Sequence, residues 1–415
     1  MRVEVRGSTA LAAGSAVSGL LAYVFFALVT RTLGAEAAAP VSVLWTYWSF
    51  AAAFLTFPVQ HWIVRSVTAR GSEGGVRSVR GRLTLMVLAL ALLAGVATWL
   101  LRERLFYRED AFFPLLVAAV TVGSAFMGTV RGVLTARNRL VAVAWALVLE
   151  NALRCLAALA LIYFSVGAAA AYGLGLAAGQ LVGLLWPGAL RLRADASAPQ
   201  DEGWLGFLAG AAGGQFSAQA VLTGGPVVLA LVGGSPTEVT ALFASLALFR
   251  APYTLAIGVM GQVTGWFTSL VVRRDLAALR RVRRLVVVGT AAGTMLAGLV
   301  GVLLGPWLVA FVFGSSIELS RTAAVLTAVG CAVALGNLVL TVMVMALDRA
   351  PALVRCWVLA GGIGLVVLVA VGGDPMLATC AAFVAAELAA CIALLAVEVR
   401  EDRRLGQLAA TTGTA

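Results

Sequence analysis

Long apolar runs follow one another along almost the whole chain, and only short polar connectors separate them. Each run has about 20–30 residues, which is the length that a helix needs to cross the hydrocarbon core of a bilayer. Because backbone groups inside lipid must find hydrogen-bond partners within the chain, we expect these runs to be helices. Charged residues make up 12% of the sequence, which is about half their share in a soluble domain. The sequence therefore predicts an all-α, polytopic integral membrane protein.

The apolar runs predict about twelve transmembrane helices. The longest polar connectors, residues 68–82, 191–203 and 273–284, are too short to fold as domains. The expected spans cover residues 9–33, 38–64, 83–101, 111–136, 140–164, 166–190, 204–233, 239–271, 285–312, 322–347, 353–371 and 376–397.

The basic residues predict how the chain is oriented in the membrane. All 30 are arginine, and the net charge is +11. With the N-terminus in the cytoplasm, 23 arginines fall on cytoplasmic segments, among them Arg131 and Arg137, while five lie outside and two lie inside spans. Cytoplasmic connectors of membrane proteins are enriched in arginine and lysine. We therefore expect an inner-membrane protein with both termini in the cytoplasm, and we attribute the charge to topology and not to nucleic-acid binding.

The two halves of the sequence resemble each other. Arg82 opens the third span 48 residues after Gly34, and Arg284 opens the ninth 50 residues after Gly234. Any two strings of apolar helices share some likeness, but the matching basic loops favour a repeat with both copies in the same orientation. The expected domains are an N-terminal six-helix bundle over 1–190, a cytoplasmic linker over 191–203, a C-terminal six-helix bundle over 204–400 and a cytoplasmic tail over 401–415.

Several stretches resemble one family of membrane proteins. The first half contains AGSAVSGLLAYVFFALVTRTLGAEAAAPVSVLWTYWSF, and the second contains VTALFASLALFRAPYTLAIGVMGQVTGWFTSLVVRRDLAALRRVRR, LGPWLVAFVFGSS and MVMALDRAPALV. Their order over residues 8–397 is similar to that of polysaccharide-biosynthesis membrane proteins, the oligosaccharide-lipid flippases of the multidrug, oligosaccharidyl-lipid and polysaccharide (MOP) exporter superfamily. The resemblance implies a MATE-like fold, in which two six-helix bundles surround a central cavity and give alternating access.

Ionisable residues at bilayer depth are candidates for substrate contact, because they are costly unless they are paired or hydrated. The fifth span contains Glu150, Asn151 and Arg154. Glu150 and Arg154 are four residues apart and so share one helix face. They either neutralise each other and position the helix, or line an aqueous cavity in which Arg154 can engage phosphate.

Arg250 in the eighth span has no acidic residue within one helical turn, and Pro252 follows it. The proline removes a helix hydrogen bond and is expected to bend the helix. An arginine without a local partner suits pyrophosphate, because its planar fork donates several charge-assisted hydrogen bonds. The alternative is an ion pair with Glu150 or with Glu387 of the twelfth span. Glu387 is itself a candidate site for a coupling ion.

The seventh span is rich in residues that weaken a helix. Gly224, Gly225 and Pro226 are candidates for a hinge. Gln215 and Gln219 lie four residues apart and form a polar stripe that is a second candidate for the cavity lining. Close packing of helices through small residues is the alternative interpretation.

The sequence contains no motif of an enzyme, a metal site or a cofactor site. It has one histidine, no metalloprotease, hydrolase or phosphate-loop motif, and no CxxC pair among its five cysteines. We therefore expect no catalysis, no metal, no cofactor and no disulfide.

The resemblance and the arginines inside the spans together indicate a flippase for a lipid-linked oligosaccharide of the undecaprenyl-pyrophosphate type. The expected partners are this substrate, membrane lipids, H+ or Na+ as a coupling ion and other polysaccharide assembly proteins. A cation-coupled multidrug exporter of the same superfamily is the alternative, although its cavity would favour acidic residues. A glycan polymerase would need a longer external loop than LRERLFYRED, and a non-transporting scaffold is a further alternative.

Reporter fusions test the expected topology. Alkaline phosphatase fused after Arg404 should be inactive, because the tail is expected in the reducing cytoplasm. The same enzyme fused after Arg104, in an expected external connector, should be active and serves as the matched control. Activity at the Arg404 fusion would contradict an even number of spans with both ends inside.

Overall fold

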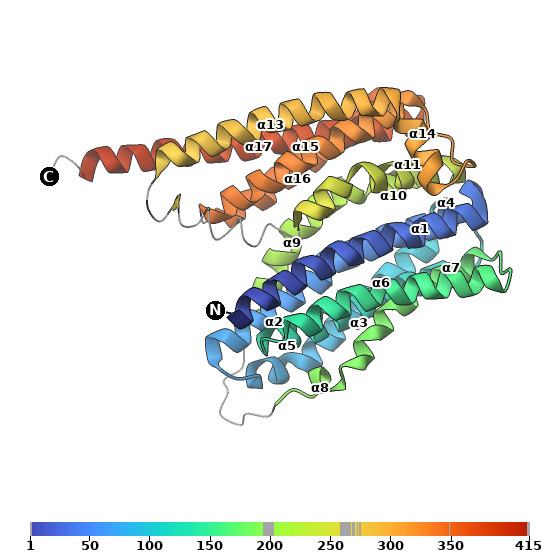
Figure 1. Ribbon diagram of the computed structural model, residues 1–415, viewed down its shortest axis with the longest axis horizontal. Helices are drawn as coiled ribbons and strands as arrows, with labels where there is room; N and C mark the ends of the chain where they lie inside the picture. The colour runs from blue at the N-terminus through green and yellow to red at the C-terminus, as the bar shows by residue number, and fades with distance from the viewer. Residues whose placement is uncertain are drawn as a thin grey trace. The chain divides into compact units, whose positions relative to one another are not determined.

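The computed structural model describes residues 2–193, 203–257, 267, 270–271, 273, 275–347 and 349–412. Within these ranges the chain is helical and has no strand, which confirms the all-α expectation (Figure 1). The first half contains α1 (Arg2–Ala51), the π-helical turn η1 (Ala52–Thr56), α2 (Phe57–Arg70), α3 (Gly74–Leu100), α4 (Arg102–Phe106), α5 (Phe112–Ala136), α6 (Leu140–Tyr163), α7 (Ala169–Ala178), the 3-10 helix η2 (Gly179–Leu185) and α8 (Pro187–Leu190). The second half contains α9 (Trp204–Thr223), α10 (Gly225–Leu231), α11 (Pro236–Phe249), α13 (Leu276–Leu303), α14 (Gly305–Phe313), α15 (Arg321–Ala346), α16 (Ala350–Val371) and α17 (Pro375–Thr412).

Many of these helices can span a bilayer. Eight helices in the described ranges are long and apolar enough, and the bent pair Pro236–Phe249 and Ala251–Ile257 makes a ninth. One of the eight, Thr9–Ala69, covers the first two expected spans, which meet at Gly34 without a connector. The sixth expected span is the shorter apolar helix Ala169–Leu185, and the seventh is divided into α9 and α10. Helix therefore occupies each expected run as far as it is described.

Contacts divide the chain into two compact units. In the first unit α1 packs on α6, and α5 packs on α2 and α3; in the second, α15 packs on α13 and α17, and α16 packs on α17 (Figure 1). The expected linker and tail lie partly outside the described residues, so the domain boundaries stay predictions. The first unit comprises Met1–Gln219, Pro226–Thr240 and Val312–Ile317, and the second comprises Ala220–Gly225, Ala241–Phe311 and Glu318–Ala415.

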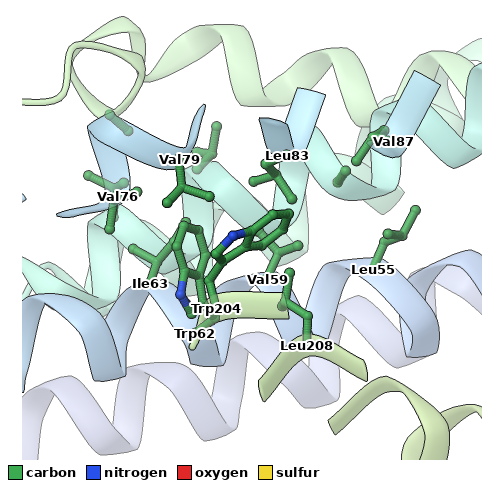
Figure 2. Packing of buried hydrophobic residues seen from close by; sticks show 14 of the residues in the cluster. Leu55, Val59, Trp62, Ile63, Val76, Val79, Leu83, Val87, Trp204 and Leu208 are labelled. Carbon is green, nitrogen blue, oxygen red and sulfur yellow. The ribbon is translucent and has the colours of Figure 1, made fainter. Parts of the chain in front are cut away.

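Helix α3 shows how the sequence separates a protein-facing side from a lipid-facing side. Val76, Val79, Leu83 and Val87 recur every three or four residues and are buried in a core with Trp62 and Trp204, whose ring centroids are 6.3 Å apart (Figure 2). The other side of the helix leaves large side chains uncovered, namely Leu85, Leu92 and Leu93, which are 69%, 68% and 67% exposed. Such a surface would be costly in water, but in a bilayer it faces hydrocarbon.

A charged clasp holds the connectors at one end of the first unit. The Arg137 guanidinium donates to both carboxylate oxygens of Glu73, at 2.6 and 2.8 Å, and also to the carbonyl oxygens of Gly188 and Arg191. The backbone N–H of Arg193 donates to the same carboxylate at 2.8 Å. Hydrogen bonds from Arg137 hold the pKa of Glu73 below its usual value. The clasp thereby ties residues 188–193 to the end of α5.

Gly34 provides a test of how α1 is built. Its backbone has φ 77° and ψ 173°, which is a conformation that residues with a Cβ adopt only at a cost of about 1–3 kcal/mol. A Cβ there would meet only Ser316 Oγ, at 3.9 Å, so the cost of Gly34→Ala comes from the backbone and not from a clash. We expect a lower melting temperature in detergent for Gly34→Ala.

Gly293→Ala is the matched control for Gly34→Ala. Gly293 lies inside α13 and a Cβ there would meet nothing within 4 Å. Alanine favours a helix over glycine by about 1 kcal/mol, so this variant should be as stable as the original protein or more so. Equal melting temperatures for the two variants would contradict the strain assigned to Gly34.

Candidate functional site

Three polar side chains of α6 lie together inside the first unit. Glu150, Asn151 and Arg154 are 3%, 5% and 0% exposed. Arg154 donates to Glu150 Oε1 at 2.7 Å and to Asn151 Oδ1 at 2.9 Å. Its Nε donates to the carbonyl oxygen of Leu176 at 3.0 Å. Asn151 in turn donates to the Ser18 hydroxyl at 2.8 Å, which links α6 to α1. Each guanidinium nitrogen of Arg154 therefore has a partner within the protein.

Arg131 completes this cluster from α5. Its guanidinium forms an ion pair with the second carboxylate oxygen of Glu150. Arg131 was expected with the arginines of the cytoplasmic segments, and its side of the membrane stays a prediction. Helix α5 continues to Ala136, so Arg131 lies more than one turn inside the helix, where it is 7% exposed. The signal available in the sequence was the position of Arg131 within the apolar run of residues 111–136.

Aromatic rings and a glycine surround Arg154. Its guanidinium carbon lies 4.4 Å from the ring centroid of Trp48 and 6.0 Å from that of Trp45, so cation–π attraction adds to the hydrogen bonds. A Cβ at Gly179 would lie 2.5 Å from Arg154 Nε. Only glycine at this position lets η2 approach the arginine so closely.

The cluster of Arg131, Glu150 and Arg154 carries an excess of positive charge. One carboxylate stands between two guanidinium groups, so the three side chains sum to +1. Within the described residues, Nε of Arg131 is a buried donor without a hydrogen-bond partner. A buried donor is costly until an acceptor reaches it. The cluster therefore has a net positive charge, and Arg131 has a buried donor that no described residue accepts.

The second unit contains a different polar pair. Asn337 of α15 donates to Glu387 Oε2 and to the Glu387 carbonyl oxygen of α17, both at 2.8 Å. Both residues are 0% exposed. In the described part of the chain, Oε1 of Glu387 and Oδ1 of Asn337 have no hydrogen-bond partner. These two buried oxygen atoms therefore could each accept a hydrogen bond or contact a cation.

Arg250 is half-buried at the bend between α11 and residues 251–257, where the helix axis turns by 50°. Its guanidinium carbon lies 6.0 Å from the ring centroid of Phe243. No ion pair of Arg250 is found within the described residues, and Glu150 pairs with other arginines. The bend expected from Pro252 is present, and its role as a moving hinge stays a prediction.

The seventh expected span is broken where the hinge was expected. Helix α9 ends at Thr223 and α10 begins at Gly225, so that Gly224 lies between the two helices and Pro226 is in the first turn of α10. A Cβ at Gly225 would approach Leu242 Cδ2 to 3.2 Å, which indicates close packing on α11. Gln215 is exposed and Gln219 is half-buried. Whether these glutamines contact a substrate stays a prediction.

Metal binding finds no support among the described residues, which contain no group of three or more histidine, cysteine or acidic side chains close enough to hold an ion. The five cysteines are unpaired thiols, four of them buried.

Residues 5–194 match the family model described as polysaccharide biosynthesis protein. The lipid II flippase MurJ, in an inward closed conformation, superposes with a TM-score of 0.74 at 12% identity, covering 93% of this chain and 86% of that chain. An inward-facing MATE family multidrug resistance transporter gives a TM-score of 0.67 at 15% identity, covering 94% and 96%. A MOP superfamily transporter from Pyrococcus furiosus gives 0.64 at 15% identity, covering 98% and 96%.

The chain shares the fold of the MATE family transporter and the MurJ flippase. The structural matches extend over more than nine-tenths of the chain, and the family match covers the first unit's charged cluster. Curated proteins give no sequence match. The family match and the fold confirm the resemblance drawn from the sequence, and the apolar helices support a multi-pass membrane protein.

The buried charge cluster gives a stability prediction. Glu150→Ala leaves two buried guanidinium groups without their counter-charge, and breaking such a group costs about 3–5 kcal/mol. We expect a large loss of folded protein, measured by size-exclusion chromatography of a fluorescent fusion. Glu103→Ala is the control, because Glu103 is 69% exposed and surface pairs contribute less than about 1 kcal/mol. Equal yields of the two variants would contradict a structural role for Glu150.

Proposed function

We propose that the protein is a flippase that moves a lipid-linked oligosaccharide of the undecaprenyl-pyrophosphate type across the cytoplasmic membrane by alternating access. The observation that carries the proposal is the family match over residues 5–194, because this segment contains the whole cluster of Arg131, Glu150 and Arg154. A positively charged group inside an apolar bundle is costly, so its presence marks a functional site by default. The proposal includes cytoplasmic termini and cooperation with other polysaccharide assembly proteins.

The chemistry of the arginines suits a pyrophosphate. Arginine keeps its proton at any physiological pH, and its planar fork matches phosphate oxygens. Arg154 uses its nitrogens within the protein, so its part is to hold Glu150 and to raise the local positive potential. In the first unit, Arg131 is proposed to contact the anion directly, together with the polar groups of Asn151, Gln215 and Gln219. In the second unit, Arg250 is proposed as an anion contact on its own.

Conformational change and ion coupling are proposed for a different group of residues. Gly224, Gly225 and Pro226 at the break between α9 and α10, and Pro252 at the 50° bend, are proposed as the positions that absorb backbone rotation. The free oxygen of Glu387 is proposed to take H+ or Na+, because a buried carboxylate gains most from either cation.

A cation-coupled multidrug exporter is the second candidate. The similarity to a MATE family multidrug resistance transporter over 94% of the chain favours it, as does the buried Glu387. It predicts efflux of lipophilic cations and indifference to lipid-linked sugars, so one pair of assays separates the two functions.

The proposed function is tested in proteoliposomes with a fluorescent oligosaccharide on a short polyprenyl pyrophosphate. Transport is the fraction of label that an added membrane-impermeant quencher no longer reaches. Arg250→Ala should slow transport by roughly tenfold or more while leaving folded protein, because a charge-assisted contact to phosphate is lost. The transport rate of Arg250→Lys should lie between those of Arg250→Ala and the original protein, since lysine keeps the charge and loses the planar fork.

Arg82→Ala is the matched control for Arg250→Ala, because Arg82 is exposed near the start of α3. It should transport at the rate of the original protein. Full transport by Arg250→Ala would remove Arg250 from the site. Export of a lipophilic cation without movement of the lipid-linked sugar would overturn the proposed function in favour of the multidrug exporter.

A further inference from the structure

A small pocket lies inside the second unit, away from the charged residues discussed above. It is enclosed by the beginning of α13, the end of α15 and the last part of α17. Its walls are mostly apolar, but one side carries a group of charges from α13 and α17. The lining residues are Phe267, Val271, Leu279, Arg283, Met343, Ala346, Leu347, Glu398 and Asp402.

Glu398 has a carboxylate oxygen at this pocket that accepts no hydrogen bond from the described residues. It is 3% exposed, and its nearest ionic partner, Arg283 Nη1, lies 3.9 Å from Oε1. Among the described residues, Glu398 Oε2 has no hydrogen-bond partner. A buried carboxylate oxygen without a donor is costly. A hydrogen-bond donor inside the pocket would satisfy this oxygen, and a positively charged donor would stabilise the carboxylate most.

The charges change sign from the pocket towards its surroundings. Asp402, 13% exposed, accepts from Arg280 Nε at 3.0 Å and lies 3.6 Å from Arg283 Nη2. The side chain of Arg283 is 21% exposed and that of Arg280 is 56% exposed. Acidic groups thus lie deepest and guanidinium groups lie nearest to solvent. With two acids and two arginines the group is neutral as a whole, which fits a zwitterion that enters with its cationic end first.

The size of the pocket restricts the cation. The enclosed space takes about one water-sized group. A primary ammonium has that size and carries three N–H donors, whereas a quaternary ammonium is larger and has none. The described residues offer no set of ligands for a metal ion. A primary ammonium is therefore the cation that matches both the volume and the free oxygen.

The pocket lies at the depth of lipid headgroups. Arg280, Arg281 and Arg284 at the beginning of α13 are followed by the apolar Leu285 and Val288, which are 62% and 59% exposed. Basic residues of a spanning helix are located at the interface, and exposed apolar ones face the hydrocarbon. A headgroup beside this part of α13 has its phosphate level with the arginines.

We propose that this pocket is a binding site for a phospholipid with a primary-amine headgroup, of the phosphatidylethanolamine kind. The ammonium donates to Glu398 and Asp402 in the pocket. The phosphate is held by Arg280 and Arg283 at its mouth, and the glycerol and acyl chains follow the apolar surface of α13. The site holds a resident lipid and is independent of the transported substrate.

Native mass spectrometry of the full chain tests the site. The protein is released from nanodiscs that contain equal amounts of phosphatidylethanolamine and phosphatidylcholine with the same acyl chains. We expect bound phosphatidylethanolamine to exceed phosphatidylcholine by about tenfold, because only the primary amine donates to a buried carboxylate. Glu398→Gln should remove this preference. Ala346→Leu, which fills the pocket and leaves the charges intact, should remove it as well.

Glu401→Gln is the matched control. Glu401 lies on the same helix, pairs with Arg349 at 2.9 Å and does not line the pocket, so its variant should keep the tenfold preference. A preference that survives in both Glu398→Gln and Ala346→Leu would overturn the proposal, as would equal retention of the two lipids by the original protein. Equal competition by soluble phosphoethanolamine, or displacement of the lipid by a lysine-rich peptide, would overturn the assignment to a lipid.

Discussion

Hydrocarbon supplies no hydrogen-bond partner, and each polar group that enters it must find one within the chain. The helices meet this demand for the backbone, and many side chains meet it locally. Thr46, Thr98 and Thr121 each donate to the carbonyl oxygen four residues earlier, at 3.1, 2.7 and 2.8 Å. Thr30 reaches further and donates to Phe313 at 2.6 Å, which ties α14 to α1 within the first unit. Satisfied polar groups of this kind hold helices together where apolar packing alone gives little specificity.

Among the described residues, the charged and amide side chains that break this rule gather in three places. Arg131 keeps a free donor, Glu387 and Asn337 keep free acceptors, and Glu398 keeps a free carboxylate oxygen. Each exception is costly in a spanning segment, so each is a candidate for contact with something that the chain itself does not provide. We assign an anion to the first, a coupling cation to the second and a lipid ammonium to the third. The three assignments differ in the group that is bound and in its location in the fold.

The charged cluster shows how far sequence reasoning could go at a site. The spacing of Glu150 and Arg154 indicated that they can pair, and the structure has this pair. Two alternatives were open, a structural pair and a cavity lining. Arg154 has partners for all its nitrogens within the protein, whereas Arg131, an unexpected member, has a donor to spare. Sequence spacing relates residues within one helix, but Arg131 and Glu150 meet across two helices.

The sequence by itself determined the all-α class, the positions of the apolar runs and some of the places where helices are interrupted, among them Gly34, Gly224 and the bend after Arg250. These features depend on local chemistry: a run of apolar residues must be helical in lipid, a glycine permits φ 77° at Gly34, and a proline bends the helix after Arg250. Only the tertiary structure decided which charges are neutralised and which are not. Glu398 and Arg283 lie more than a hundred residues apart in the sequence, and the free oxygen of Glu398 is visible only when α13 and α17 are placed together, because a hydrogen bond depends on position and not on order along the chain.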